Sequence, residues 1–128
     1  MTLIDFVAAV KATFPVGTVI VNPGGGTSTI VGYGDKNVSY LRGNSTITVE
    51  LIDLYEAYSS FRGQRVSSSD LRVFNPSVFD SAARPAGHSC NCTFLFRVLE
   101  RLSLSGPISG SGVRGNPYAV FMHGSSAV

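Results

Sequence analysis

The stretch from residue 18 to residue 49 most constrains the fold. Short runs rich in Val, Ile and Thr alternate there with turns that contain Gly or Asn, a pattern typical of strands joined by tight connections. We therefore predict a β-meander with one apolar face and one face rich in hydroxyl groups. Its strands are expected at residues 18–21, 27–33, 38–42 and 45–49.

Helical patterns flank the meander on both sides. Thr2 is a predicted N-cap, and Ser67 with Asp70 has the spacing of a capping box. Apolar residues three and four positions apart predict helices at residues 3–14, 51–62, 67–74 and 91–104. A last strand is expected at residues 118–122, in an antiparallel sheet with the meander. The predicted class is α+β, with residues 1–128 as a single domain.

Composition limits the classes of function. Only 14% of the 128 residues are charged against 44% hydrophobic, which excludes a disordered tail and suggests that another copy of the chain covers some apolar surface. A net charge of +2 is small for a nucleic-acid-binding surface and argues against nucleic acid as a partner. No apolar run of about 18 residues is present, so we expect no membrane span.

Cysteine usage favours a reducing compartment. Cys90 and Cys92 are too close in sequence for an ordinary disulfide, and the chain has no other cysteine. No signal peptide is apparent, and we expect a cytosolic protein.

Three of the eight arginines precede a glycine and then a side-chain amide, whereas the only lysines are Lys11 and Lys36. A guanidinium group can contact a phosphate in two places, and the adjacent glycine allows close backbone approach. The pattern indicates a site for a polar, phosphorylated molecule; the alternative is that it only makes tight turns. The three copies are Arg42-Gly43-Asn44, Arg62-Gly63-Gln64 and Arg114-Gly115-Asn116.

Several further residues have both a structural and a functional interpretation. The loop Gly24-Gly25-Gly26-Thr27 offers backbone donors but lacks the lysine and the following helix of a Walker loop, so it is also a plausible flexible hairpin. Phe79 is either a core residue or a platform for a base. Arg62 and Arg65 either contact an anion or interact with the end of the second predicted helix.

The pentapeptide His88-Ser89-Cys90-Asn91-Cys92 has three interpretations. Zinc would need His123 as a fourth ligand, at a spacing that fits no common module. A cysteine nucleophile near a helix N-terminus and His88 has no identifiable carboxylate partner. The interpretation we favour is a capped helix with core cysteines, whose N-terminus also faces an anion.

The run from Asn22 to Ser28, the turn from Arg42 to Ile47 and the segment from Asn75 to Thr93 together resemble the first family of phage Thoeris anti-defence proteins. These are small signal sponges. The resemblance implies a non-enzymatic protein, in the cytoplasm of the infected bacterial host, that sequesters cyclic ADP-ribose isomers made by Toll/interleukin-receptor-domain immune enzymes. It also implies a homodimer or higher assembly, up to a hexamer, with pockets between subunits. Some members of the family hold cyclic oligonucleotides at separate sites.

The family uses an aromatic ring, an asparagine and arginines, and these roles fall by motif on Phe79, Asn91 and Arg114. Neither a cofactor nor a metal is expected. Two alternatives are a nucleic-acid-binding module and a thiol-dependent enzyme that acts on a nucleotide. In the complete candidate site the base stacks on Phe79, and the pyrophosphate is neutralised by Arg114, Arg62 and Arg65. The ribose hydroxyls are bound by Asn91, Thr27 and Asn116. The rest of the lining is expected to be Arg42, Asn44 and His88.

Overall fold

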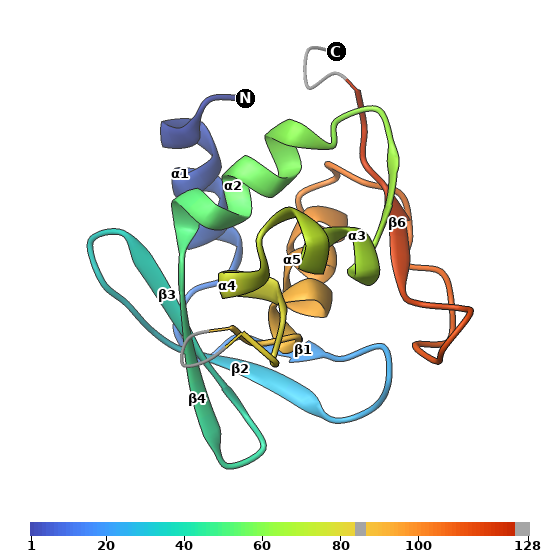
Figure 1. Cartoon of the computed structure of the whole chain (residues 1–128). Helices are drawn as coiled ribbons and strands as arrows, with labels where there is room; N and C mark the ends of the chain where they lie inside the picture. The colour runs from blue at the N-terminus through green and yellow to red at the C-terminus, as the bar shows by residue number, and fades with distance from the viewer. Residues whose placement is uncertain (84–86, 125–128) are drawn as a thin grey trace.

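The computed structural model describes residues 1–83 and 87–124, and it confirms the α+β class (Figure 1). This part of the chain forms a four-stranded antiparallel sheet, a two-stranded sheet and five helices. None of these helices is both long enough and apolar enough to cross a membrane.

The meander forms as predicted, in the order β1-β2-β3-β4. Tyr40 pairs with Ile47 across two neighbouring strands, and both side chains are buried. On the opposite face Thr29 lies between Val19 and Leu41, so this face mixes hydroxyls with exposed aliphatic groups instead of being mainly hydroxyl. The strands are β1 (Val19–Val21), β2 (Thr27–Tyr33), β3 (Asn37–Arg42) and β4 (Ser45–Glu50).

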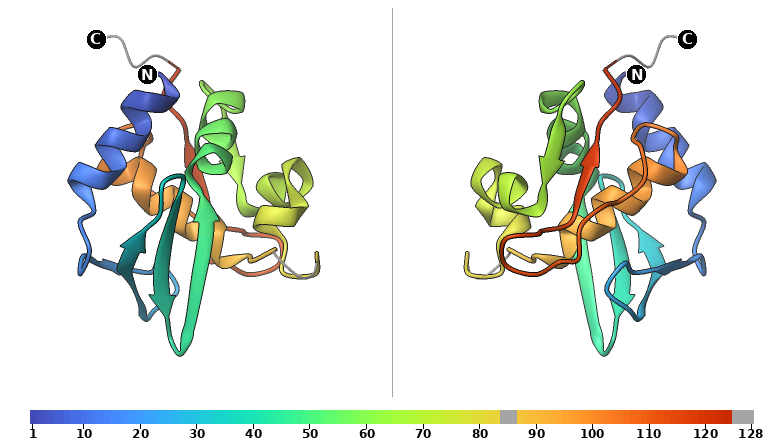
Figure 2. Two further views of the ribbon diagram at one scale, coloured as in Figure 1. Left: turned by 90° about the vertical axis from the view of Figure 1, so that its left-hand side faces the viewer. Right: turned by 90° about the vertical axis from the view of Figure 1, so that its right-hand side faces the viewer.

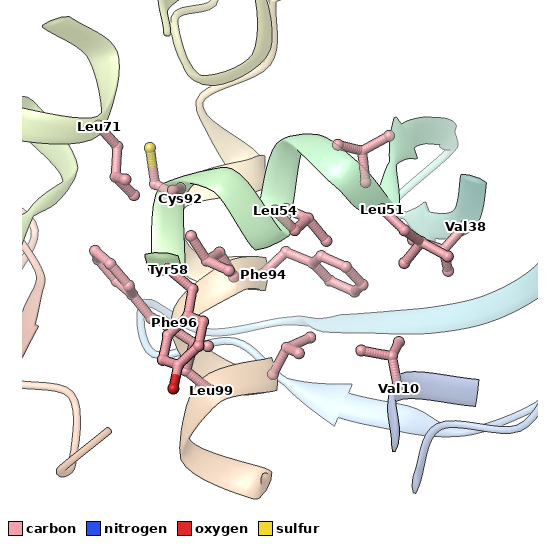
Figure 3. Packing of buried hydrophobic residues seen from close by; sticks show 14 of the residues in the cluster. Val10, Val38, Leu51, Leu54, Tyr58, Leu71, Cys92, Phe94, Phe96 and Leu99 are labelled. Carbon is pink, nitrogen blue, oxygen red and sulfur yellow. The ribbon is translucent and has the colours of Figure 1, made fainter. Parts of the chain in front are cut away.

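Helix α5 (Cys90–Arg101) runs through the centre of the molecule (Figure 1). Because Phe94, Leu95 and Phe96 are consecutive and all buried, the helix is covered on more than one side. The Phe94 ring stacks on Tyr40 of the meander with ring centroids 4.1 Å apart. Figure 3 shows how side chains from several elements meet at this helix. The helix therefore links the sheet to the rest of the fold.

The other helices pack around this centre. Helix α1 (Leu3–Thr13) begins with the predicted cap at Thr2, and α3 (Ser68–Phe74) begins with the predicted capping box of Ser67 and Asp70. Helix α2 (Leu51–Ser60) packs against α1. Figure 2 shows α1 and α3 on opposite sides of the molecule.

The helix prediction is wrong at two places. No helix is predicted between residues 74 and 91, but Pro76 begins a short helix, α4 (Pro76–Phe79), because proline suits a first helical position where no N–H is needed. Helix α5 begins at Cys90 and ends at Arg101 instead of at residue 104. Ser103 then adopts a positive φ of 59°, which turns the chain away from the helix axis.

The C-terminal strand forms, but its partner differs from the prediction. β6 (Ala119–Phe121) pairs with β5 (Arg65–Ser67) in a separate two-stranded sheet and not with the meander. Val66 and Val120 face each other in this pair and are both buried. Strand β5 escaped prediction because Val66 is its only apolar residue, whereas β6 lies within the apolar run from Tyr118 to Met122.

Candidate functional site

A cleft of about 470 Å³ opens where α3, the start of α5, the end of β3 and the loop before β6 meet. We call it the arginine cleft. Its volume lies within the range of small-molecule sites. Its lining residues are Arg42, Ser68, Ser69, Arg72, Ser89, Cys90, Cys92, Thr93, Gly112, Val113, Arg114, Gly115, Pro117 and Tyr118.

Three arginines from separate elements line this cleft. Arg42 donates through Nη1 to Thr93 Oγ1 at 3.4 Å, and Arg72 donates through Nη2 to Ser69 Oγ at 3.2 Å. Arg114 has no hydrogen bond or ion pair with the residues that the structure describes. Their guanidinium groups thus retain most of their donors for a bound anion.

No Asp or Glu is among the described residues that line the cleft. The Asp70 carboxylate accepts from the Ser67 backbone N–H at 2.8 Å, and that of Asp80 accepts from the Ala82 N–H at 2.9 Å. Within residues 1–83 and 87–124 the one ion pair joins Arg97 to Glu100. The charged side chains of the lining are therefore all positive, which favours an anionic ligand.

Glycines fix the loop that carries Arg114. Gly112 has a φ of +75°, a value that disfavours other residues, and a Cβ at this position would overlap the Tyr118 ring. Backbone hydrogen bonds from Ser111 and Gly112 to the Asn116 carbonyl, at 3.1 and 3.0 Å, close the loop. The close approach to Tyr118 thus comes from Gly112, whereas Gly115 of the predicted motif has a φ of +86° and open space where a Cβ would stand.

The start of α5 forms part of the cleft wall. Its N-terminal dipole adds positive potential there, and the hydroxyls of Ser68, Ser69, Ser89 and Thr93 supply further polar atoms. The Thr93 hydroxyl also donates to the Cys90 carbonyl at 3.3 Å. Cationic and hydroxyl groups together suit a phosphate ester attached to a sugar.

The two cysteines differ in their surroundings. Cys92 is buried, and its thiol lies 3.8 Å from the Ser68 carbonyl and 3.6 Å from that of Phe79. Burial raises the pKa of the Cys92 thiol to about 12, so it remains protonated at neutral pH. Cys90 is half-buried and lines the cleft. A nucleophilic role for Cys92 is therefore not supported.

Two central predictions of the candidate site are wrong. Phe79 has no exposed surface and belongs to the core, so its ring cannot stack on a base. Asn91 is 2% exposed, accepts from the Tyr40 hydroxyl at 2.8 Å and donates to the Val78 carbonyl at 2.9 Å. Its amide joins the meander, α4 and α5 and has no contact with the cleft, nor is it the helix cap, which is Ser89.

Of the predicted site residues, the cleft includes Arg42 and Arg114. The Arg62 guanidinium lies over the Tyr58 ring, 5.6 Å from its centroid, and its Nε is buried without a partner. Asn116 holds its own loop through a hydrogen bond from Nδ2 to Ser111 Oγ at 3.0 Å. The remaining predicted residues outside the lining are Thr27 on β2, Asn44 in the β3–β4 turn, Arg65 on β5 and His88 before α5.

Arg72, Ser69 and Tyr118 escaped the sequence prediction. Arg72 lacks the glycine and amide that mark the other arginines, yet it lies one helical turn after Ser69 in α3. The capping box at Ser67 fixes where this helix begins, so the sequence already indicated that Ser69 and Arg72 lie on the same side of it. Nothing in the sequence distinguishes Tyr118 as a cleft residue.

The described residues contain no group of three or more His, Cys, Asp or Glu side chains placed to hold a metal ion. The predicted zinc alternative therefore gains no support from the geometry of His88, Cys90 and Cys92.

Comparison with known proteins gives no match: no family model, no curated protein and no solved structure is similar enough to place this chain in a family. Function must therefore be argued from the cleft itself.

Proposed function

We propose that the protein binds a small phosphorylated nucleotide in the arginine cleft and sequesters it without changing it. One observation carries this proposal: Arg42, Arg72 and Arg114 line one cleft in which no described residue is a carboxylate. Three guanidinium groups carry enough positive charge to neutralise the two negative charges of a pyrophosphate diester. The described lining residues include no carboxylate or imidazole to act as a general base, which is compatible with a sponge.

Tyr118 takes the role first predicted for Phe79. It is the aromatic ring among the described residues that line the cleft, and it is half-buried. A partly exposed ring next to arginines is suited to stack on a base, an interaction of about 1–3 kcal/mol. Hydroxyls of Ser68, Ser69 and Thr93 would contact the ribose.

The ligand class we favour is the cyclic ADP-ribose isomers, because the sequence resembles the first family of phage Thoeris anti-defence proteins. In that role the protein would act in the cytoplasm of the infected host and block Thoeris immunity. Sequestration with a nanomolar Kd requires about 12 kcal/mol. Three charged hydrogen bonds of about 1.5–3 kcal/mol each and a stacked base of about 1–3 kcal/mol reach this value only at their upper limits, so the ribose contacts and enclosure of the ligand must also contribute.

A thiol-dependent enzyme is the second candidate, favoured by the position of Cys90 in the cleft lining. Such an enzyme would modify the nucleotide. Cys90→Ala would then abolish activity, whereas the sponge predicts unchanged binding by this variant.

Native mass spectrometry tests the proposal. The purified protein is incubated with lysate from an activated Toll/interleukin-receptor-domain enzyme, with an inactive enzyme as the matched control. We expect an added mass the size of ADP-ribose, released unchanged by heat. A ligand of altered mass would indicate the enzyme, and no added mass from the active lysate would contradict the proposal.

A further inference from the structure

The glycine-rich connection between β1 and β2 lies at the edge of the arginine cleft, although it contributes no residue to the lining. We call residues 22–26 (Asn22-Pro23-Gly24-Gly25-Gly26) the glycine loop. A Cβ at Gly24 would stand 2.9 Å from the Tyr118 hydroxyl oxygen, so the loop backbone runs next to the end of that ring. Figure 1 shows the glycine loop and the loop before β6 on the same side of the molecule.

Strand pairing places the glycine loop beside Arg42 as well. Ser28, two residues after the loop, is the partner of Arg42 in the β2–β3 pair, and residues paired in this way lie on the same face of a sheet. The Ser28 hydroxyl donates to Asn22 Oδ1 at 2.8 Å, which ties the loop to this pair. The glycine loop is therefore next to two residues of the cleft lining, Arg42 and Tyr118.

Asn22 has an unused donor although its side chain is buried. The residue is 5% exposed, and its Nδ2 group donates to no residue in the ranges 1–83 and 87–124. In the same ranges, the side-chain polar atoms that are enclosed without a partner are the Tyr58 hydroxyl and Arg62 Nε, so Asn22 Nδ2 remains accessible. It lies 4.0 Å from where a Cβ of Gly26 would stand, on the inner side of the loop. Because buried amides normally use their donors, this one indicates a ligand.

The loop backbone provides two further donors. The Gly25 N–H donates to the Asn22 carbonyl at 3.1 Å, and the Asn22 N–H donates to the Gly26 carbonyl at 3.0 Å. The N–H groups of Gly24 and Gly26 donate to none of the residues that the structure describes. Positive φ values of 104° at Gly25 and 76° at Gly26 turn the chain sharply. Backbone N–H groups gathered in such a turn form a concave site for an anion.

Helix α5 holds the start of the loop in place. Arg97 Nε donates to the carbonyl of Val21, the residue before the loop, at 2.9 Å. The same guanidinium group pairs with Glu100 through Nη1 at 2.8 Å, which fixes its position and neutralises that carboxylate. A loop that is already ordered loses less entropy when it binds a ligand.

We propose that the glycine loop is a second phosphate subsite of the arginine cleft. Asn22 Nδ2 and the N–H groups of Gly24 and Gly26 donate to one phosphate group of the ligand, while the arginines hold the other. This inference rests on the proposed function, since it extends the same site. It selects for ligands with two linked phosphates, because a single phosphate would leave one of the two subsites empty.

NMR titration of the native chain with inorganic pyrophosphate tests the subsite, because this probe does not depend on the base that the ligand carries. We expect the N–H signals of Gly24 and Gly26 and the side-chain amide of Asn22 to shift. The N–H of Gly34, in the turn at the other end of β2, should stay unchanged. Shifts confined to the arginines of the cleft would overturn this inference and leave the proposed function standing. No binding of pyrophosphate would also overturn it, and mass spectrometry with the lysate would then test the proposed function separately.

Asn22→Asp tests the side-chain donor. It keeps the acceptor for the Ser28 hydroxyl but replaces the Nδ2 donor with a negative oxygen, so pyrophosphate should bind at least about tenfold more weakly in isothermal titration calorimetry. Asn37→Asp is the matched control, because Asn37 Oδ1 also accepts a local hydrogen bond, from the Gly34 N–H at 3.1 Å, away from the cleft. Unchanged affinity in Asn22→Asp, or equal losses in both variants, would overturn the inference. Circular dichroism checks that both are folded, and the NMR titration needs no variant.

Discussion

The core around α5 and the arginine cleft at its N-terminal end use polar groups in opposite ways. In the core, both ends of the Asn91 amide are satisfied, by Tyr40 and by the Val78 carbonyl. In the cleft, Arg114 has no partner among the described residues. Polar groups of the core hold elements together, and those of the cleft are available to a ligand. Proximity along the chain does not separate the two roles, because Asn91 adjoins Cys90, a cleft residue.

The largest expected effect concerns stability and comes from the core. Phe79→Ala should lower the free energy of unfolding by about 3–5 kcal/mol, because it leaves a cavity in a fully buried site. Urea denaturation measures it, with Phe121→Ala as the control at a 54% exposed position. A loss below about 1 kcal/mol would show that Phe79 is not a core residue.

Asn91→Ala should cost about 2–3 kcal/mol of stability. The substitution removes two hydrogen bonds and leaves the buried Tyr40 hydroxyl without its acceptor, while the Val78 carbonyl keeps only the His88 N–H as a donor. Denaturation reports the loss, and Ser59→Ala at an exposed position of α2 is the control. Unchanged stability together with lost ligand affinity would instead return Asn91 to the binding site.

Arg114→Ala should affect ligand binding and not stability. We expect stability to stay the same and affinity for the bound nucleotide to fall about 10- to 100-fold, because a charged hydrogen bond is lost. Isothermal titration calorimetry measures the affinity. Arg65→Ala is the matched control, since Arg65 is exposed and lies outside the cleft. Equal losses in both variants would mean that general charge, and not the cleft, binds the ligand.

The smallest expected effect is a difference in thiol reactivity between Cys90 and Cys92. Maleimide should label half-buried Cys90 in the native protein, whereas Cys92 should react only after unfolding, because burial keeps its thiol protonated. Mass spectrometry of peptides from the labelled protein locates the adduct. Labelling of Cys92 in the native protein at neutral pH would contradict the burial on which its raised pKa depends.

Local signals allowed much of the fold to be predicted. The caps at Thr2 and Ser67 and the turns of the meander act through neighbouring residues, so the sequence contains them directly. The pairing of β5 with β6 joins segments about fifty residues apart. No local pattern specifies such a partner.

The candidate site was harder to predict than the fold. Phe79 and Asn91 have side chains common in binding sites, but their burial depends on how α4 and α5 pack against the meander. Arg42 and Arg114 were predicted because glycine follows each, whereas Arg72 reaches the same cleft from a helix, without that signal. Residue type alone cannot distinguish a satisfied polar group from an available one.

The most direct test is a crystal structure of the protein with the nucleotide that it retains from lysate of an activated Toll/interleukin-receptor-domain enzyme. Our account predicts phosphate density within hydrogen-bond distance of Arg42, Arg72 and Arg114, with the base against Tyr118. A ligand that lies elsewhere and leaves these three arginines in solvent would contradict it.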